Sequence, residues 1–399
     1  MKRKKILWLC SWYPNKLEPF NGDFVKRHAE AVATFCDVHV IHIARDKETI
    51  VTKDVFETND TVPGLNEKII YYNINPSGGK WLQQFRSHRK LINLFKQEIG
   101  IFINEFGKPD LIHVHMGMKA GLAALWAKKE YGINYVVTEH WSGFLENATE
   151  KFVHTPRLFQ NAWKKILREA AAVSAVSNTL ASGIKKNFSS IIPVVIPNVV
   201  NTDIFSFDVK INSDSAEPVF VHISGMQSLK NPQQILEAFS VVVKNYPSAR
   251  LYMIGARPTE LLNFVNEQGL ENAVSFYEEM SQESLVKFLQ PATALILVSS
   301  YETFGCVIIE ANACGVPVIV SDIPVFHETV KQDVNGVFPK LNDSQNLANV
   351  MMQCFLNRQE FNRVNIAANT ADQYSYAVVG KMFLNWYETI IKNSKKLAF

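Results

Sequence analysis

Short apolar runs alternate with longer amphipathic stretches along nearly the whole chain. Residues 6–10 are apolar on both faces, as expected of a central parallel strand, and residues 24–35 carry an apolar stripe at helical spacing. Residues 38–43 form the next apolar run. A strand, loop, helix and second strand make a βαβ unit, in which ligands bind at the loop after the first strand's carboxyl end.

The same alternation continues to about residue 200. Residues 46–77 are polar and predict short strands or a flap. The remaining pattern predicts helices and strands in turn: helices at 80–106, 121–131, 163–172 and 177–188, and strands at 109–115, 135–138, 173–176 and 194–196.

A polar stretch at 208–218 marks a domain boundary, because low hydrophobicity and turn residues favour a connection between domains. The alternation then restarts, with strands at 219–223, 250–254, 274–276, 295–298 and 318–320 and helices at 233–243, 259–268, 281–290, 306–314, 347–355 and 374–392. This pattern predicts two α/β domains with doubly wound parallel sheets, at 1–200 and 201–374, and a final helical segment at 375–399.

Composition narrows the class of protein. The 399 residues suffice for two cores, and a net charge of +3 gives no argument for nucleic acid as a partner. Five cysteines, an odd number at irregular spacing, favour reduced thiols and a cytoplasmic location. The apolar run near the N-terminus is only about six residues long, which favours a buried strand over a signal peptide.

Candidate chemistry concentrates at residues 299–328. Glu302 precedes a predicted turn and helix start, and Glu310 lies inside that helix. The free N–H groups of a helix N-terminus bind phosphate, and carboxylates accept hydrogen bonds from hydroxyls. The stretch could therefore hold a nucleoside diphosphate and grip hydroxyl groups on either side. The alternative is an amphipathic helix with one solvated glutamate.

The spacing Glu302-x7-Glu310, the following ACGVPVI and the later His327-Glu328 resemble the signature of the family 4 retaining glycosyltransferases. The resemblance implies the GT-B fold of two Rossmann-like domains facing a cleft, which closes around the donor. It also implies that Glu302 binds the donor sugar, that Glu310 binds the ribose, and that the diphosphate is held by the N–H groups of Phe304, Gly305 and Cys306.

Other parts of the chain match the same family. Gly22 lies in the loop after the first strand, where relatives have a glycine-containing loop over the donor phosphate and the acceptor; a plain turn is the alternative. His140 follows the strand at 135–138, and many members have a histidine there that contacts the donor sugar. His113 and His115 alternate on one strand and are interpreted as core or rim residues.

Lys230 follows the second domain's first strand and would bind the phosphates. Relatives usually have an arginine five residues earlier, and this chain has Gly225 there. Arg257 and Arg27 are the nearest candidates for the missing charge. The stretch 197–205, with its proline-asparagine turn, resembles the family's linker, and the family's last helix packs back on the first domain.

The predicted helix at 80–106 is amphipathic and basic, with Arg86, Arg89 and Lys90 among its charges. Such a helix can lie on an anionic membrane surface, at the inner face of the cell membrane in a cytoplasmic protein. The alternative is a helix packed on its sheet with a solvated basic face.

The sequence therefore predicts a retaining glycosyltransferase that moves a sugar from a nucleoside diphosphate sugar to a hydroxyl of a glycan or lipid-linked acceptor. His140 and Glu302 are the candidate catalytic residues. No D-x-D triplet occurs, so the reaction is expected to need no metal and no other cofactor. The alternatives are a nucleotide-sugar 2-epimerase of the same architecture, a catalytically weak nucleotide-binding scaffold, and a membrane-docked scaffold using the basic helix.

Overall fold

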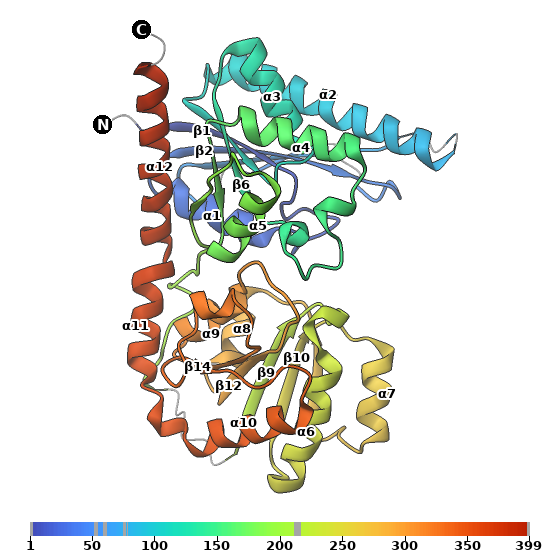
Figure 1. Ribbon diagram of the computed structural model, residues 1–399, viewed down its shortest axis with the longest axis vertical. Coiled ribbons are helices and arrows are strands. Elements are labelled where there is room, and N and C mark those ends of the chain that lie inside the picture. Colours follow the sequence, from blue (N-terminus) through green and yellow to red (C-terminus); the bar gives the residue numbers. More distant parts are fainter. Residues whose placement is uncertain are drawn as a thin grey trace. The chain divides into compact units, whose positions relative to one another are not determined.

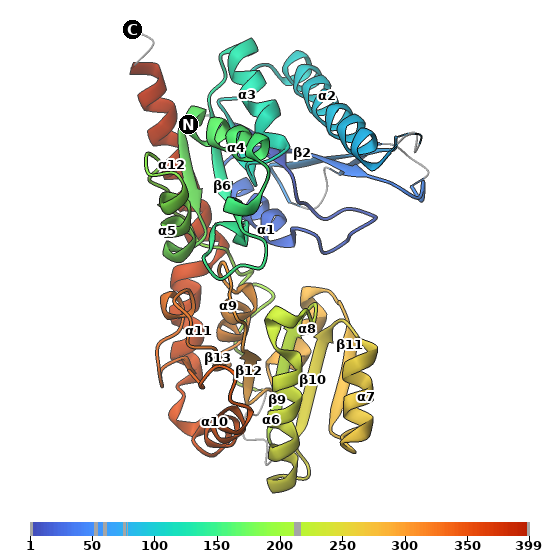
Figure 2. The same ribbon diagram turned by 45° about the vertical axis from the view of Figure 1, so that its right-hand side comes forward.

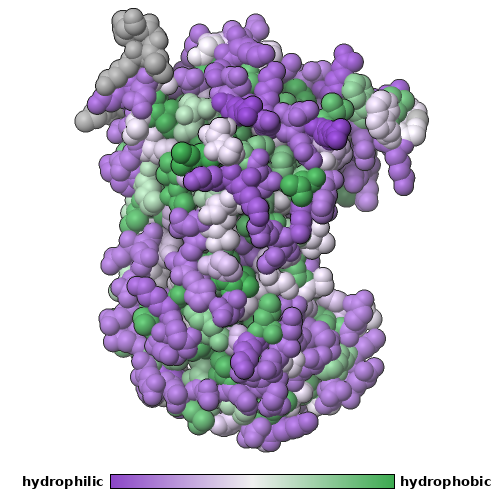
Figure 3. All heavy atoms as spheres, in the orientation of Figure 1, coloured by the Kyte–Doolittle hydropathy of each residue, from purple (hydrophilic) through white to green (hydrophobic). Residues whose placement is uncertain are grey.

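The computed structural model describes residues 3–51, 55–58, 62–74, 77, 79–210 and 217–396. The chain forms two compact units, which we describe separately (Figures 1 and 2). Unit 1 comprises Met1–Val199 and Tyr376–Phe399, and unit 2 comprises Val200–Ser375. On the face seen in Figure 3, hydrophilic residues predominate, with scattered apolar ones between them.

Unit 1 is built on a sheet with strand order β3-β4-β2-β1-β5-β6-β7-β8. Neighbouring strands pair in parallel, except for the antiparallel pair β3 and β4 at one edge. The strands are β1 (Lys5–Cys10), β2 (Asp37–Arg45), β3 (Val55–Thr58), β4 (Leu65–Tyr72), β5 (Leu111–His115), β6 (Tyr135–Glu139), β7 (Ala172–Ala175) and β8 (Val194–Val195).

Helices cover both faces of this sheet, as Figures 1 and 2 show. Helices α2, α3 and α4 lie on one face and α1 and α12 on the other, and α5 packs on β7, β8 and the turn after β6. Their bounds are α1 (Asp23–Ala33), α2 (Lys80–Phe106), α3 (Ala120–Tyr131), α4 (Arg157–Glu169), α5 (Asn178–Asn187) and α12 (Tyr376–Lys396). Short 3-10 turns follow β6 at Ser142–Phe144 and Phe152–His154.

Strand β1 shows why this layering forms. Every residue from Ile6 to Cys10 is buried, as the continuous apolar run predicts. Alternate side chains point to opposite faces, and Ile6, Trp8 and Cys10 share one core with residues of α1 and α12, including Phe383 and Tyr387. Helix α12, the last element of the chain, therefore completes the core around its first strand.

Unit 2 has a six-stranded parallel sheet in the order β11-β10-β9-β12-β13-β14. Helices α6 and α10 pack together against it, and α9 packs with α11. The strands are β9 (Val219–Ser224), β10 (Arg250–Gly255), β11 (Val274–Glu278), β12 (Ala294–Leu297), β13 (Val318–Val320) and β14 (Gly336–Val337). The helices are α6 (Pro232–Asn245), α7 (Thr259–Glu267), α8 (Gln282–Leu289), α9 (Cys306–Ala313), α10 (Ser344–Leu356) and α11 (Arg363–Tyr374), with 3-10 turns at Ser228–Lys230, Phe326–Glu328 and Arg358–Glu360.

The prediction of two α/β domains with parallel sheets is confirmed, with three local differences. Helix α4 begins six residues before its predicted start at 163. Helix α11 was not predicted, because its sequence RVNIAANTADQY buries only Ile366 and Thr370 and shows little apolar stripe. Strand β3 pairs antiparallel with β4 at one edge of the sheet, which was not predicted because the polar pattern of this stretch does not specify strand direction.

Candidate functional site

Each sheet contains a point at which successive strands are added on opposite sides. In unit 2, β9 is flanked by β10 and β12, and in unit 1, β1 is flanked by β2 and β5. In open α/β sheets, ligands bind outside the carboxyl ends of the strands at such a switch point. The fold therefore predicts ligand sites at two places: the loops after β9 and β12 in unit 2, and the loops after β1 and β5 in unit 1.

In unit 2 the switch point brings together Lys230 and Glu302. The Lys230 ammonium pairs with Glu302 Oε1, and the same oxygen accepts a hydrogen bond from Ser299 Oγ at 3.1 Å. Both side chains retain some exposure, 20% for Lys230 and 14% for Glu302. The structure thus brings together the predicted phosphate-binding cation and the predicted sugar-binding carboxylate, as an ion pair that polar ligand groups could replace.

Hydrogen bonds between the two loops hold this pair in place. Asn231 Nδ2 donates to the carbonyl oxygen of Val298 at 2.7 Å, and the Ser300 N–H donates to the carbonyl of Leu229 at 2.8 Å. Asn231 has a left-handed backbone with φ of 49° and precedes helix α6. The loops after β9 and β12 therefore form one braced surface, which reduces the cost of ordering them around a ligand.

Helix α9 begins at the same edge. Gly305 precedes it with φ of 92°, and a Cβ there would lie 3.0 Å from Ile308 Cδ1 and Phe326 Cε1. Gly305 has no side chain with which to cap this helix start, and a helix N-terminus is a favourable place for an anion. Phe304 is buried and Cys306 partly exposed. Glu310 lies within the helix and is 1% exposed, so a ligand can reach its carboxylate only where neighbouring side chains move aside.

The arginine that relatives place five residues before Lys230 is replaced in this sequence. Gly225 occupies that position after β9. Arg257 follows the neighbouring strand β10 and is exposed, so its guanidinium can turn toward the same edge. Arg27 belongs to unit 1, where it is buried in α1 and pairs with Asp23.

In unit 1 the predicted residues Gly22 and His140 lie at the carboxyl edge of the sheet. Gly22 precedes α1 with φ of 69°, and a Cβ there would come within 2.9 Å of Trp12 atoms, so the turn requires glycine. His140 follows β6 and is 5% exposed. Its ring packs on Phe24 and stacks on His115, whose Nδ1 lies 3.2 Å from His140 Nε2.

The other predicted histidines are core residues. His113 contacts the Tyr387 hydroxyl at 2.6 Å and Thr138 Oγ1 at 2.7 Å, and both His113 and His115 are fully buried. Burial lowers the pKa of His113, His115 and His140 well below the ordinary value, so these rings are neutral at pH 7.

A fourth histidine was not singled out in the sequence. His28 of α1 lies with His115 and His140 in a group whose nitrogen atoms are within 4.8 Å of one another. His28 Nε2 contacts the Pro197 carbonyl oxygen at 3.0 Å, and desolvation lowers its pKa to about 4. Three neutral imidazoles of this kind could hold a metal ion. His28 lies three residues after Val25, on the apolar stripe of α1, and this spacing is the feature of the sequence that indicates its burial.

Glu139 is a second buried residue that sequence reasoning missed. Its Oε1 accepts hydrogen bonds from the Gly117 N–H at 2.8 Å and from Trp163 Nε1 at 3.1 Å. A Cβ at Gly117 would lie 2.6 Å from this oxygen, so the contact requires glycine. Burial raises the pKa of the Glu139 carboxyl to about 7, against the smaller opposing effect of these hydrogen bonds.

Comparison with known families now defines the class of protein. The family described as Glycosyltransferase Family 4 matches residues 22–204, and the family described as Glycosyl transferases group 1 matches residues 203–372. Together the two matches span nearly the whole chain, and both sheets belong to the two-domain GT-B architecture. The chain therefore belongs to the family 4 type of glycosyltransferases and is a glycosyltransferase.

Individual relatives agree with this assignment. N-acetyl-alpha-D-glucosaminyl L-malate synthase of Bacillus anthracis is 23% identical over 292 residues, which are 70% of this chain and 74% of that protein. A D-inositol 3-phosphate glycosyltransferase of Rhodococcus erythropolis is 27% identical over 59% of this chain and 57% of its own length.

Solved structures share the fold at low identity. Sucrose-phosphate synthase of Thermosynechococcus elongatus has a TM-score of 0.75 and 18% identity, covering 98% of this chain and all of that chain. HepE of Anabaena, solved in complex with UDP-glucose, has a TM-score of 0.69 and 16% identity, covering 96% of this chain and all of its own.

Proposed function

We propose that this glycosyltransferase uses a nucleoside diphosphate sugar as donor and retains the configuration of the transferred sugar. The observation that carries the proposal is the switch point of unit 2, where Lys230, Glu302 and the N-terminus of α9 lie on one braced edge. A cation and a helix N-terminus suit a diphosphate, and a nearby carboxylate suits sugar hydroxyls.

Donor binding would use the ion pair as a preformed receptor. In this proposal the diphosphate takes the Lys230 ammonium and the N–H groups at Phe304, Gly305 and Cys306. Glu302 then turns its acceptor oxygens to the sugar, and Glu310 to the ribose. Arg257 is our candidate for the charge that relatives place five residues before Lys230. HepE, of the same fold, is described in complexes with UDP and with UDP-glucose.

The transfer step needs stabilisation of the leaving group more than a protein nucleophile. The bond from the anomeric carbon to the phosphate oxygen breaks, and the acceptor oxygen forms the new bond on the same face. The leaving phosphate takes the acceptor proton, so no metal or other cofactor enters the balance. We assign His140 and Gly22 to the side of the sugar and acceptor, which places the acceptor on unit 1 and the donor on unit 2.

A catalytically weak nucleotide-binding protein is the second candidate, and Gly225 in place of the usual arginine is the observation that favours it. It predicts nucleotide affinity without transfer to any acceptor. A 2-epimerase of the same architecture would instead invert C2 of the sugar without an acceptor.

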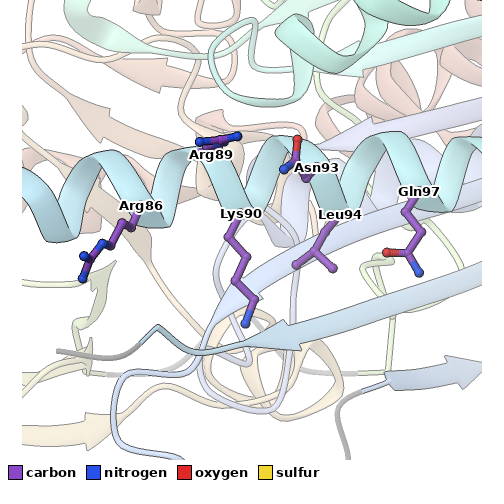
Figure 4. A pocket seen from close by; sticks show the side chains of 6 residues that line it. All are labelled: Arg86, Arg89, Lys90, Asn93, Leu94 and Gln97. Atoms are coloured by element: carbon purple, nitrogen blue, oxygen red, sulfur yellow. The ribbon is translucent and has the colours of Figure 1, made fainter. Parts of the chain in front are cut away.

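We further propose that α2 gives unit 1 a peripheral contact with anionic membranes. Trp81 and Phe85 stack with ring centroids 5.9 Å apart and are 76% and 54% exposed. Basic side chains follow on the same helix, and Figure 4 shows Arg86, Arg89 and Lys90 around a shallow pocket. Aromatic and basic residues together suit an interfacial helix.

The proposed location is the cytoplasm, because all five cysteines are free and four of them are buried. Among the helices of the described ranges, none combines the length and hydrophobicity that a membrane-spanning helix needs. The contact through α2 would therefore be made from the surface of the bilayer.

Calorimetric titration with UDP, GDP and ADP, and with their sugars, tests the donor site. We expect one nucleoside diphosphate to bind, and Lys230→Ala and Glu310→Ala each to weaken it about tenfold, since a charged hydrogen bond contributes about 1.5–3 kcal/mol. Lys244→Ala, at an exposed position at the end of α6, is the matched control and should bind like the wild type. Unchanged affinity in both site variants would overturn the site assignment.

A further inference from the structure

A second cavity lies at the switch point of unit 1. It has a volume of about 540 Å³, within the range of roughly 300–1,000 Å³ that is usual for small-molecule sites. It is lined by Ser11 and Trp12 after β1, by Met116, Met118 and Lys119 after β5, by Trp141 after β6, and by residues of α4 and His88 of α2. The cavity therefore occupies the place where α/β sheets bind ligands.

The lining of this cavity is strongly apolar and aromatic. Trp141 stacks on Trp163 with ring centroids 4.9 Å apart and an interplanar angle of 15°, and Phe159 packs edge-on against Trp163. The apolar side chains that line the cavity include Trp12, Met116, Met118, Trp141, Phe159 and Trp163. Aromatic rings of this kind stack on flat or apolar ligand faces.

Two basic side chains face the same space. Lys119 and His88 both line the cavity, and the pKa of His88 is lowered by burial and, to a smaller extent, by the Lys119 charge. Lys119 is exposed as a residue, yet crowding by surrounding protein lowers the pKa of its ammonium. The carboxylates on this side are Glu150, which lines the cavity, and Glu18, which acts on Lys119 in the opposite direction.

The backbone that presents Lys119 is strained and firmly held. Met116 has φ of 66° and Lys119 has φ of 67° with ψ of −76°, conformations that residues with a Cβ rarely adopt. Ser11 Oγ donates to the carbonyl of Met118 at 2.6 Å, and Glu139 accepts from the Gly117 N–H. Strain that is fixed by buried partners is typical of ligand sites.

An apolar surface continues beyond the cavity. Trp81, Phe85 and His88 fall at i, i+4 and i+7 on α2 and so share one helix face, with His88 at the cavity. Leu158 of α4, also in the lining, is 85% exposed. A ligand with an apolar tail could therefore lie in the cavity and extend along this face.

We propose that this cavity binds the acceptor, and that the acceptor is an anionic amphiphile: a hydroxyl-bearing head with a phosphate or carboxylate beside Lys119 and His88, and an apolar tail along Trp81 and Phe85. The role of this ligand as acceptor rests on the proposed function. The binding of the amphiphile depends only on residues of unit 1. The proposal narrows the acceptor from any glycan or lipid to one class of molecule.

Calorimetry on the full chain without nucleotide tests this, with octyl phosphate, octyl glucoside and inorganic phosphate as probes. Octyl phosphate should bind about tenfold more tightly than octyl glucoside, because only the phosphate engages Lys119, and inorganic phosphate should not bind at the same concentrations. Lys119→Ala should reduce octyl phosphate to the affinity of octyl glucoside, and Lys119→Arg should restore part of the difference.

The controls separate this proposal from the donor site. Lys129→Ala, at an exposed position on α3, should bind octyl phosphate like the wild type. Three outcomes would overturn the acceptor site. They are equal affinity for the two octyl compounds, wild-type affinity for octyl phosphate in Lys119→Ala, and displacement of octyl phosphate by a nucleoside diphosphate. If the wild type binds no nucleoside diphosphate, the proposed donor is contradicted. The octyl phosphate titration still tests the cavity of unit 1 in that case.

Discussion

The two switch points have the same topology and opposite chemistry. In unit 2 the loops after β9 and β12 present an ion pair and a helix N-terminus, with Lys230 and Glu302 in contact. In unit 1 the cavity beside the loops after β1 and β5 is lined by tryptophans and methionines together with Lys119. The fold fixes where a ligand can bind, and the loop residues decide which ligand chemistry is recognised.

The burial of titratable groups also differs between these regions. Unit 1 keeps His28, His115, His140 and Glu139 inside protein near its carboxyl edge, in neutral or readily neutralised forms. At the unit 2 site, Lys230 and Glu302 form an ion pair with partial exposure. A neutral, apolar edge suits an amphiphile, whereas a polar edge with a lysine suits a diphosphate.

The largest expected effect comes from Glu139. Its pKa is raised from 4.5 to about 7, so between these values the unfolded state loses its proton first and stability falls as pH rises, by about 3 kcal/mol in total. Glu139→Gln should lack this loss, because the amide has no proton to release in this range. Urea unfolding at pH 5 and pH 8, monitored by tryptophan fluorescence, measures the difference.

This readout is specific, because all seven tryptophans belong to unit 1. The buried histidines are present in both proteins, so the difference between wild type and variant isolates Glu139. Parallel pH profiles for the two proteins would show that the carboxyl is not neutral in the fold.

A smaller effect is expected at the other edge, from Gly305→Ala. The positive φ and the two carbon atoms 3.0 Å from the new Cβ should cost about 2 kcal/mol and displace the N-terminus of α9, with about tenfold weaker nucleoside diphosphate binding. Far-UV circular dichroism during unfolding, together with calorimetry, measures both changes.

Gly269→Ala is the matched control for strain. Gly269 also has a positive φ, of 66°, but no atom lies within 4 Å of a Cβ built there. It should lose a little stability and bind nucleotide like the wild type. Wild-type nucleotide affinity in Gly305→Ala would separate the α9 turn from donor binding.

The smallest expected effect concerns α2. The double variant Trp81→Ala, Phe85→Ala should sediment about tenfold less with vesicles of equal parts phosphatidylglycerol and phosphatidylcholine, because two exposed aromatic rings are lost from the interface. Ile192→Ala, which removes another exposed apolar side chain of unit 1, is the control. Equal binding of wild type to pure phosphatidylcholine, or an unchanged double variant, would remove the membrane contact.

The sequence predicts regular elements well where the pattern is strong. The helix expected at 80–106 is α2 to the residue, and the strand at 318–320 is β13. The short linear motif around Glu302 lies at the carboxyl edge of the unit 2 sheet, after β12. Its pairing with Lys230, 72 residues away, follows from the neighbouring positions of β9 and β12 and is visible only once strand order is known.

The cavity of unit 1 could not be predicted in the same way. Its residues come from the loops after β1, β5 and β6 and from α2, α3 and α4, and they form no linear motif. The raised pKa of Glu139 could not be predicted from the sequence either, because it depends on burial and on partners such as Trp163 that lie far along the chain.

The division of labour between the two edges is tested most directly by one calorimetric comparison. Glu310→Ala and Lys119→Ala are each titrated with octyl phosphate and with the nucleoside diphosphate that the wild type binds most tightly. Each variant should lose about tenfold in affinity for one ligand and keep the other, Glu310→Ala losing the nucleotide and Lys119→Ala the octyl phosphate. Wild-type affinities throughout, or loss of both ligands in one correctly folded variant, would contradict separate donor and acceptor sites.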